Sequence, residues 1–545
     1  MQKLDDATLL AALASVHIHG SQEKAAKATG ISQGRISERI TEAKKRGLAH
    51  VVGGSIEVFG TIALPLPAKG KRQVYILTSA QDRTKLHPCW HDLVALAKHD
   101  NAKIMVSTFK YNKDAKGQQK SAKYDSREQE TAALYPREII PFICNERIDI
   151  APNLTFCGEL NVLPTATNPL EGLEQYTYRK STIVGHPKLA LKSVPSMKGE
   201  GVKLMYTTGC VTQRNYIKRK VGFKAEHFHS YGGLIVEVDD KGRWYPRQLQ
   251  FGPDGAIYDK DRRVKHGEVT TGHRVEDINF GDTHAATSDK EVADISWGHR
   301  KDSMVEVLRP KSVHVQDLQD NGGRSHHTRK DPHAVFKAHF NGAWILADEL
   351  KLTASVLWDD ISRPWYETWV VDSNHNRHTD RYLKEIDWRD DPANARLVLG
   401  LNLMILDAIV AGTDDKLCIT EQALRRSRMM THDGYGKNFV RFLLEDESHI
   451  ILPNIDGGIE SGLHCDRGAN GSKGSISGIA RTDRKINGAD KHTVAIRNHA
   501  YFNGTTAKLV QGWNHGLSSW THANTVTYQN GTRAIYSIWK GKWTA

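Results

Sequence analysis

The sequence predicts a multidomain α/β protein, and three observations lead to that prediction. The chain has 545 residues, whereas one domain usually holds about 50 to 200. Hydrophobic residues make up 39% of the chain, which is enough to build real cores. Apolar, β-rich runs alternate with helical patterns in the middle of the chain and towards its C-terminal end. We expect a helical unit at 1–62, a linker at 63–73, an α/β domain at 74–272 and a further domain at 273–545.

The composition indicates an intracellular protein with a polyanionic partner. The formal net charge is +12 and the pI is near 9.2, which favours DNA as a partner. A basic protein that is merely soluble is the alternative. The six cysteines never form a CxxC pair, so neither a disulfide framework nor a cysteine zinc site is indicated. The N-terminus lacks the layout of a signal peptide and no run of about 18 apolar residues occurs, so we expect no membrane partner.

The sequence pattern of residues 1–50 predicts three helices. Asp5 or Asp6 can cap the first helix, whose apolar residues Leu9, Leu10 and Leu13 recur at helical spacing.

A short helix, a glycine turn and a longer helix follow. Ser21 and Ser32 can cap the two helices, Gly30 allows the turn between them, and Ile36 and Ile40 are expected to face inward. This arrangement resembles the helix-turn-helix of DNA-binding regulators.

The helix-turn-helix interpretation assigns the polar side chains of the second helix to DNA. Four would face the major groove: Gln33, Arg35, Ser37 and Arg39. Three would contact phosphates: Lys44, Lys45 and Arg46. The run VVGGSIEVFGTIAL at 51–64 would form the hairpin of a wing. The alternatives are a small helical bundle used for oligomerisation and a winged helix without a DNA role.

The middle of the chain opens with a β-α-β pattern. The strand-like run 73–79, the helical run 93–100 and the strand-like run 102–109 predict the start of an α/β domain. The lysine-rich stretch 110–123 is expected to be an exposed loop, either a solvated surface or a loop that tracks a nucleic-acid backbone. No catalytic pattern is apparent in residues 70–270.

A basic and aromatic segment lies at 206–224. Its aromatic side chains, Tyr206, Tyr216 and Phe223, could stack on bases. Its cations could contact phosphates: Arg214, Lys218, Arg219 and Lys220. A buried strand with basic flanks explains the same pattern equally well.

From about Glu276 the pattern changes to strands that end in metal-ligand residues. The apolar runs 278–280 and 313–315 lead to Asp282 and Asp317, with helical sequence between them. This predicts a βαβ unit whose ligands gather at the carboxyl edge of the sheet. Five segments offer carboxylates, imidazoles or an amide: Asp282-x-His284, Asp317-x-x-Asp320, Asn374-His375, His464 and Asp490-x-His492. Together they form a candidate two-metal hydrolase site.

The order of these five segments resembles that of the calcineurin-like metallophosphoesterases, whose pattern is DxH, GDxxDR, GNH(D/E), a lone His, and GHxH. The resemblance covers residues 276–545 and implies an αββα sandwich there. The expected fold is then an N-terminal helix-turn-helix, a central α/β domain and a C-terminal metallophosphoesterase-like αββα sandwich. A phage-type, Mre11-like DNA nuclease branch suits the helix-turn-helix and the positive charge.

The resemblance implies a role for each matching residue. One ion would be held by Asp282, His284 and His492, and the other by Asn374, His464 and Asp490, with Asp317 bridging the two. Nitrogen and oxygen ligands without thiolate imply two divalent ions, Mn²⁺ before Fe²⁺ or Zn²⁺. His375 would be the general acid and Asp320 would orient it. Three residues after the second motif are further candidates for contacting substrate phosphate: Arg324, His326 and His327.

The sequence departs from the family pattern at several positions. Gln316 and Asn321 replace the glycine and the arginine of GDxxDR. Ser373 and Asn376 replace the glycine before, and the acidic residue after, the Asn-His pair. Asp490 replaces a histidine of the last motif, so a carboxylate would stand in place of an imidazole among the ligands of the second ion.

The leading expectation is a two-metal phosphodiesterase that cleaves DNA in the cytoplasm, which would be the host's cytoplasm if the chain is of phage origin. One alternative is a phosphatase acting on protein or nucleotides. Another is a DNA-binding regulator or scaffold with a catalytically silent phosphoesterase domain. The sequence leaves open whether chains assemble into a homo-oligomer.

Overall fold

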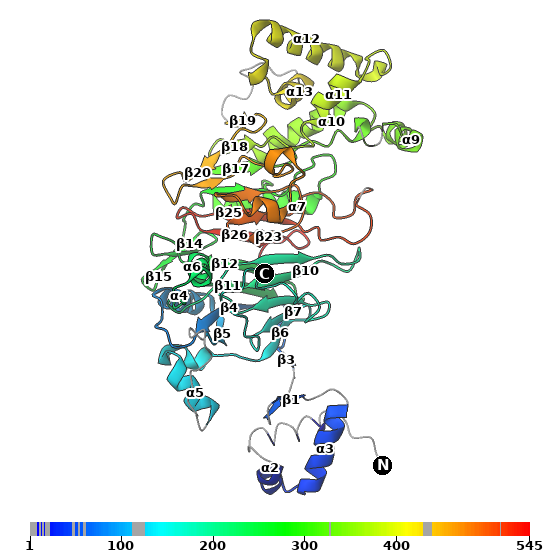
Figure 1. Ribbon diagram of the computed structural model, residues 1–545. Helices are drawn as coiled ribbons and strands as arrows, with labels where there is room; N and C mark the ends of the chain where they lie inside the picture. Colours follow the sequence, from blue (N-terminus) through cyan, green and yellow to red (C-terminus); the bar gives the residue numbers. More distant parts are fainter. Residues whose placement is uncertain are drawn as a thin grey trace.

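Figure 1 shows the computed structural model of the chain, which is a mixed α/β protein of several parts, as the sequence predicts. It describes residues 8–9, 12, 16, 22–45, 50–52, 55–57, 61–111, 126–325, 327, 329–428, 439–512 and 514–545. The molecule is elongated, with its N-terminal helices at one end in this view (Figure 1).

The N-terminal unit contains two helices joined by a tight turn: α2 (Gln22–Thr29) and α3 (Gln33–Lys45). Gly30 occupies the turn with φ of 69°, a left-handed conformation that suits glycine. The Ser32 hydroxyl accepts a hydrogen bond from the backbone N–H of Arg35 at 3.4 Å, so it caps α3 as predicted. Ile36 and Ile40 are buried, and a small core forms from Leu9, Val16, Ala25, Ile36, Ile40 and Ala43.

Several expectations for this unit fall on positions that lie outside the described residues: Asp5, Asp6, Leu10, Leu13, Ser21 and Arg46. Strands β1 (His50–Val52) and β2 (Ser55–Glu57) pair antiparallel where the wing was expected. β3 (Thr61–Ala63) does not extend this hairpin, because it pairs in parallel with β6 (Arg147–Ala151) of another sheet. The last residues of the expected wing therefore belong to the central region.

The central region is built around β4 (Arg72–Gln81), α4 (Cys89–Asp100) and β5 (Lys103–Phe109). The two strands are parallel, which confirms the predicted β-α-β start. β11 (Gly232–Asp239) and β12 (Trp244–Gln250) extend this sheet as an antiparallel pair. The lysine-rich loop expected at 110–123 falls largely outside the described residues.

Shorter elements complete the central region. They are α5 (Arg127–Leu134), α6 (Lys220–His227), β13 (Ile257–Asp259), β14 (Arg262–Lys265) and β15 (Glu268–Thr270).

One sheet runs through both halves of the chain and, among the described residues, has 11 strands in the order β20-β21-β22-β24-β23-β9-β10-β8-β7-β6-β3. Its further strands from the first half are β7 (Leu154–Cys157), β8 (Ser181–Val184), β9 (Leu191–Val194) and β10 (Lys203–Thr207). Those from the second half are β20 (Ile450–Ile451), β21 (Ile459–Glu460), β22 (Lys485–Gly488), β23 (Ala495–Arg497) and β24 (Ala500–Phe502).

The junction in this sheet is the antiparallel pairing of β9 with β23, where Leu191 faces Ile496. Both residues belong to one hydrophobic core that also contains Phe156, Ile183 and Val494. Strands and core therefore continue across position 273, where the sequence suggested a domain boundary.

A second large sheet carries the ends of the strands that the sequence singled out. In the described part of the chain its order is β19-β18-β17-β16-β25-β26. Its strands are β16 (Asp277–Asn279), β17 (Ser312–Val315), β18 (Glu367–Val370), β19 (Val440–Phe442), β25 (Ala523–Thr527) and β26 (Arg533–Ser537). β16 to β19 are parallel, and α7 (Lys290–Ser296) and α8 (Met304–Leu308) connect β16 to β17. The predicted βαβ unit is confirmed.

The remaining helices lie in and beyond the β17–β18 and β18–β19 connections. They are α9 (Pro332–Phe340), α10 (Leu346–Ser355), α11 (His378–Glu385), α12 (Ala395–Ala411), α13 (Ile419–Ser427) and the short α14 (Ile476–Ile479).

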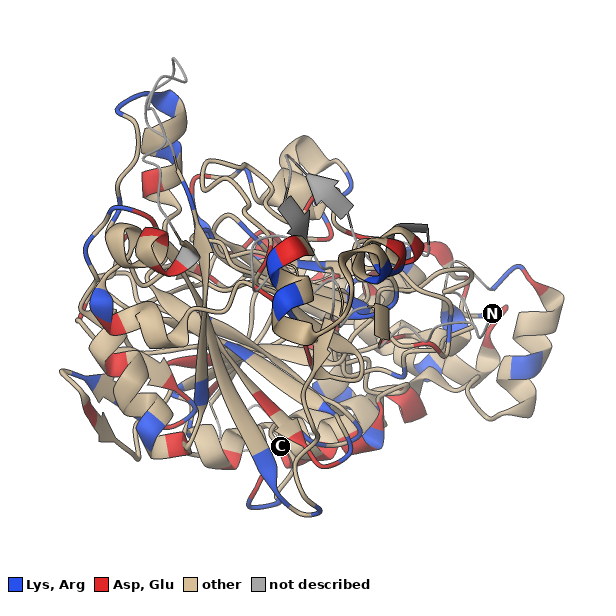
Figure 2. Cartoon of the chain, turned by 90° about the horizontal axis from the view of Figure 1, so that it is seen from below, with Lys and Arg blue, Asp and Glu red and all other residues tan. Residues whose placement is uncertain are grey.

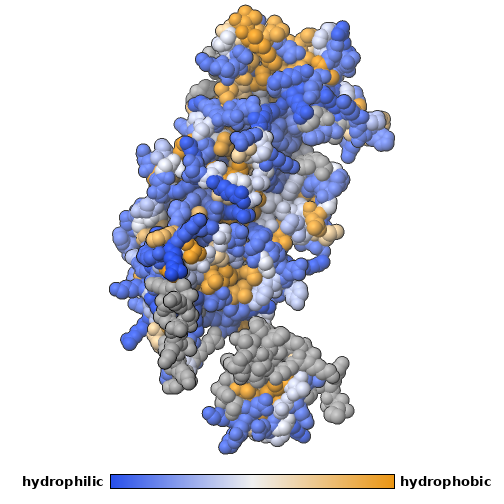
Figure 3. All heavy atoms as spheres, in the orientation of Figure 1, coloured by the Kyte–Doolittle hydropathy of each residue, from blue (hydrophilic) through white to orange (hydrophobic). Residues whose placement is uncertain are grey.

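α12 lies at the opposite end of the molecule from α2 and α3, and an apolar patch covers that end (Figures 1 and 3). Its exposed apolar side chains are Leu399, Leu403, Leu406, Ile409 and Val410. Among the described residues, the segment Pro392–Ala411 is the one helix long and apolar enough to cross a membrane by length and composition, with 22% of that window buried. Core helices pass the same test, and Leu397, Val398 and Leu401 of α12 are indeed buried.

Candidate metal centre

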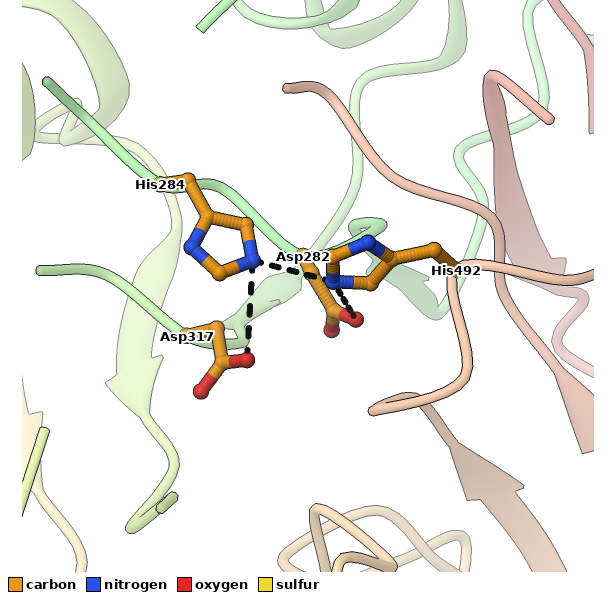
Figure 4. A group of neighbouring side chains, drawn as sticks. All are labelled: Asp282, His284, Asp317 and His492. Carbon is orange, nitrogen blue, oxygen red and sulfur yellow. Dashed lines mark hydrogen bonds and ion pairs between the residues drawn. The ribbon is translucent and has the colours of Figure 1, made fainter. Parts of the chain in front are cut away.

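Four side chains from three distant segments meet in the interior of the C-terminal half. Asp282, His284, Asp317 and His492 each place one donor atom within 4.8 Å of the others, and all four are buried. Figure 4 shows the side chains pointing toward one another. His492 Nε2 lies 3.0 Å from Asp282 Oδ2 and 3.0 Å from His284 Nε2, and His284 Nε2 lies 3.6 Å from Asp317 Oδ2.

The parallel strands place these residues at the carboxyl edge of the sheet. Beyond the end of β16, the backbone N–H of Thr283 donates to the Gln316 carbonyl at 2.9 Å. The N–H of His284 donates to the Asp317 carbonyl at 2.7 Å, so the two connecting loops stay side by side past the sheet. This is the edge at which ligands of open α/β sheets bind.

The backbone is strained where the cluster forms. His284, Asp317, Asp490 and His492 all have positive φ, between 43° and 71°. This left-handed conformation costs a non-glycine residue about 1–3 kcal/mol and is typical of functional sites, where the surroundings hold it in place.

His464 also lies in this cluster, and it comes from the loop between β21 and β22 of the 11-stranded sheet. Its Nε2 lies 3.2 Å from Asp317 Oδ2 and 3.9 Å from Asp490 Oδ1. Its Nδ1 lies 3.0 Å from Gln316 Oε1, an acceptor that makes Nδ1 the protonated nitrogen and leaves Nε2 for the cluster. Asp490 also forms an ion pair with Lys491, and its backbone N–H donates to Asp282 Oδ1 at 3.2 Å.

A second group of potential ligands shares His284. The Nδ1 atom of His284 lies 2.6 Å from Asp320 Oδ1, and His375 Nδ1 lies 3.5 Å from the same oxygen. The backbone around Asp320 is fixed by Asn376, whose side-chain oxygen accepts from the N–H groups of Leu318 and Gln319. Asp320 thus orients both a candidate ligand and the candidate general acid.

The electrostatics of the centre reflect a surplus of buried negative charge. Burial lowers the pKa of the His284 imidazole, but the Asp320, Asp317 and Asp282 carboxylates outweigh it and raise that pKa to about 9. Burial also lowers the pKa of the His464 imidazole, but the nearby Asp317 and Asp282 carboxylates raise that pKa to about 10. Burial raises the pKa of the Asp317 carboxyl, but His464 and His375 hold it well below its usual range. Burial raises the pKa of the Asp490 carboxyl.

These residues fit a metal ion. Asp317 Oδ1 and Asn374 Oδ1 are buried and have no hydrogen-bond partner among the described residues. Leaving such oxygens without a partner is costly, and a cation would satisfy them. Carboxylate, imidazole and amide donors without a thiolate suit Mn²⁺, Fe²⁺ or Zn²⁺.

A basic cavity of about 450 Å³ adjoins the second group of potential ligands, because His378 Nδ1 in its wall lies 3.1 Å from the Asp320 carbonyl. Its other lining residues are His327, Asn374, Arg377, Asp380, Arg381, Lys384 and Arg467. The sequence pattern predicted His327 as a phosphate contact but not the cations in and just before α11. Arg377, Arg381 and Lys384 recur at helical spacing after the Asn-His pair, which could have indicated them.

Arg324 does not contribute to this cavity, contrary to the sequence-based prediction. Its guanidinium is buried, pairs with both oxygens of Asp391 at 2.5 and 2.7 Å, and lies over the Trp344 ring. These contacts join the segments that lead into α10 and α12, and the buried cation is not available to a substrate phosphate. His326 lies outside the described residues.

The candidate DNA-binding residues of α3 lie on its outer side. Gln33 and Arg35 are exposed, and Ser37 and Arg39 are half-buried. Lys44 and Lys45 form the last turn of α3, but their side chains lie outside what the structure describes.

The basic segment 206–224 is only partly the surface that the sequence suggested. Arg214, Lys218, Arg219 and Lys220 are exposed, as a nucleic-acid contact requires. Tyr206 and Tyr216 are buried, because Tyr206 sits in the interior of β10 and Tyr216 packs beneath His229. The interpretation as a buried strand therefore fits Tyr206, whereas Tyr216 is buried in the loop between β10 and α6.

The fold and the centre define a class of protein: a mixed α/β protein with a buried group of aspartates and histidines that could hold a metal ion. The chain is 34% identical over 522 residues to Protein A1 of Escherichia phage T5, which covers 94% of this chain and 88% of that protein. It therefore belongs to the same family of phage proteins as Protein A1. No protein-family model and no solved structure matches the chain.

Proposed function

We propose that this protein is a two-metal phosphodiesterase of the calcineurin-like type that cleaves DNA. The observation that carries the proposal is the meeting of Asp282, His284, Asp317, His464 and His492 around one buried point. These residues come from segments whose order resembles that of the metallophosphoesterases. The two large sheets that supply them support an αββα sandwich, and the net charge of +12 supports a polyanionic substrate.

Each residue of the site would have a separate role in the reaction. Asp317 lies between His284 and His464, so it is placed to hold both ions. Divalent ions bound there would supply an activated water and neutralise charge on the phosphate. His375 would donate a proton to the leaving oxygen through Nε2, while Asp320 holds the ring at Nδ1. Arg381 and Lys384 of the 450 Å³ cavity are exposed and pair with Glu385 and Asp380. They would exchange these carboxylates for the flanking phosphates.

The departures from the family pattern are compatible with this chemistry. Gln316 supports His464 through a hydrogen bond, a task that a glycine cannot perform. Asn376 fixes the loop that carries Asp317 and Asp320. In this proposal the N-terminal helices act as a helix-turn-helix, with Gln33 and Arg35 of α3 exposed toward DNA.

A DNA-binding protein without catalytic activity is the second candidate. The ion pair between Lys491 and Asp490 favours it, because Lys491 neutralises the carboxylate that replaces a histidine of the family pattern. A competing cation of this kind weakens the second metal position.

The decisive experiment replaces the bridging carboxylate. Asp317→Asn should reduce Mn²⁺-dependent DNA cleavage to background while DNA binding, measured by fluorescence anisotropy, stays within about twofold. Asp387→Asn is the matched control, since Asp387 is exposed and pairs with Arg389 at the surface. Cleavage by the Asp317 variant at the native rate would refute the bridging role.

The same preparation separates the candidate functions. Wild-type protein loaded with Mn²⁺ should cleave DNA in preference to a small phosphomonoester. Hydrolysis of the monoester alone would indicate a phosphatase. If the protein binds DNA, hydrolyses neither substrate and contains fewer than one transition ion per chain, it is the DNA-binding protein without catalytic activity.

A further inference from the structure

A second cationic cavity lies where α6 meets the β23–β24 turn, away from the residues of the metal centre. Its volume is about 220 Å³, and it shares no lining residue with the Asp and His cluster. Seven basic or imidazole residues contribute to its wall: Lys188, Arg214, His227, His229, Lys485, His499 and Arg533. Asp456 is the acidic residue of the wall, and it pairs with Lys485 at 3.2 Å.

Two of these cations are buried with only neutral oxygens around them. Lys188 donates to the Thr167 carbonyl at 2.8 Å and to Asn498 Oδ1 at 2.9 Å. Arg533 donates to the carbonyls of Ile486 and His499 and to Asn487 Oδ1. Within the described chain, neither has a carboxylate at ion-pair distance.

Comparison with other buried cations shows what is unusual here. Arg247 is fully buried and pairs with Asp259 and Glu237, so its charge is compensated within the fold. Lys203 is buried without a carboxylate, but its ammonium donates to three oxygens and so uses all three protons. Lys188 has two oxygen acceptors, which leaves one donor for a ligand.

The neighbouring groups add to the positive potential. Burial, together with the cations Lys224 and Arg497, lowers the pKa of Lys188 to about 8. Burial lowers the pKa of Arg533 to about 10. His227 Nε2 and His499 Nε2 meet at 3.1 Å, where one imidazole donates to the other, so two paired imidazole rings border the cavity. An uncompensated positive cavity of this kind is stabilised by an anion.

Aromatic rings line the same cavity. Lys188 Nζ lies 4.5 Å above the Phe228 ring, and Arg533 lies over Tyr501. Arg214 lies over Tyr231, whose ring stacks on His87 at 3.6 Å. These rings already hold cations or another ring against their faces, so they help to fix the positions of Lys188, Arg214 and Arg533 in the cavity wall.

We propose that this cavity is a second phosphate-binding site, which takes the phosphate of a nucleotide between Lys188, Arg214 and His227. The nucleotide is either free or part of a DNA strand, since the phosphate group is the same in both. The site does not depend on the metal centre and stands whether or not the protein is a nuclease.

The test uses full-length protein that carries Asp317→Asn and has been freed of metal with a chelator, so that the metal centre does not bind the probes. Inorganic phosphate, dAMP and a 5′-phosphorylated single-stranded oligonucleotide are titrated separately by calorimetry. The test variant is Arg214→Ala with His227→Ala, both exposed positions whose replacement leaves the core intact. Lys241→Ala is the control, an exposed cation in the β11–β12 turn that does not line the cavity.

We expect at least one probe to bind, the double variant to lose about tenfold or more in affinity, and the control to change by less than about twofold. Binding of dAMP identifies a free-nucleotide site, and binding of the oligonucleotide alone identifies a strand site. The proposal is overturned if no probe binds at concentrations up to about 1 mM, or if the double variant binds as the parent does.

Discussion

His284 and His464 are protonated at neutral pH when no metal is present, because neighbouring aspartates raise their pKa values to about 9 and about 10. A metal ion binds neutral imidazole, so it must displace these protons. We expect Mn²⁺ affinity to rise between pH 7 and 9 by roughly tenfold per pH unit for each proton displaced.

Calorimetry in buffers of different ionisation enthalpy measures the protons released. Release should approach zero above the two pKa values. A Mn²⁺ affinity that does not change between pH 7 and 9 would show that neither imidazole is a ligand.

Gln316 is a positioning residue for His464. Gln316→Leu removes the acceptor at Nδ1 while keeping a similar volume, so the ring loses its fixed orientation. We expect Mn²⁺ affinity to fall by about 10- to 100-fold with little change in the far-UV spectrum. Gln316→Glu, which retains an acceptor oxygen, should restore most of the affinity. Equal affinity in the leucine variant would assign His464 a purely structural role.

At the scale of single elements, α10 holds the loop that carries Asp317 and Asp320. Glu349 of α10 is half-buried and accepts hydrogen bonds from the backbone N–H groups of Asn321 and Gly322. Burial and the nearby Asp320 raise its pKa to about 7. The helix therefore reaches the metal centre through one side chain.

Replacing Glu349 with alanine should leave two backbone donors without acceptors and destabilise the protein by about 1–3 kcal/mol. Urea unfolding measures the loss, and Mn²⁺ affinity should fall with it because the loop is released. Lys351→Ala, at an exposed position on the same helix, should change neither quantity. Native Mn²⁺ affinity in the Glu349 variant would mean that the loop is held by its other contacts.

The elements differ in how far the sequence determines them. β16, β17 and their connecting helices follow from local periodicity, and the acids at the strand ends follow from the same pattern. β3 could not be assigned, because its partner β6 lies some 85 positions further along the chain and local alternation does not identify partners. Arg324 was misassigned for a related reason, since its partner Asp391 is distant in sequence.

At the scale of the molecule, the N-terminal unit has a core of its own, separate from the others. Ile36→Ala should destabilise that unit by about 2–5 kcal/mol. Differential scanning calorimetry should show one transition shifted downward and the main transition unchanged. DNA affinity should fall as α3 loses its packing, while hydrolysis of a short substrate persists. A parallel shift of both transitions would show that the unit folds together with the rest.

In the view of Figure 2, basic and acidic residues are interspersed along the elements. A net charge of +12 therefore acts through local sites such as the cavity at α11 and the cavity at α6, rather than through one uniform basic face.

The pairing of β9 with β23 has a consequence for how such a gene can change. A crossover that joined the first half of one phage's gene to the second half of a diverged relative's would bring together two strand edges selected in different lineages. The mosaic would have to match Leu191 against Ile496 and rebuild the core around them. This architecture favours inheritance of the two halves as one block. Recombination breakpoints among natural variants should therefore be scarce between residues 191 and 496 and more frequent before residue 61.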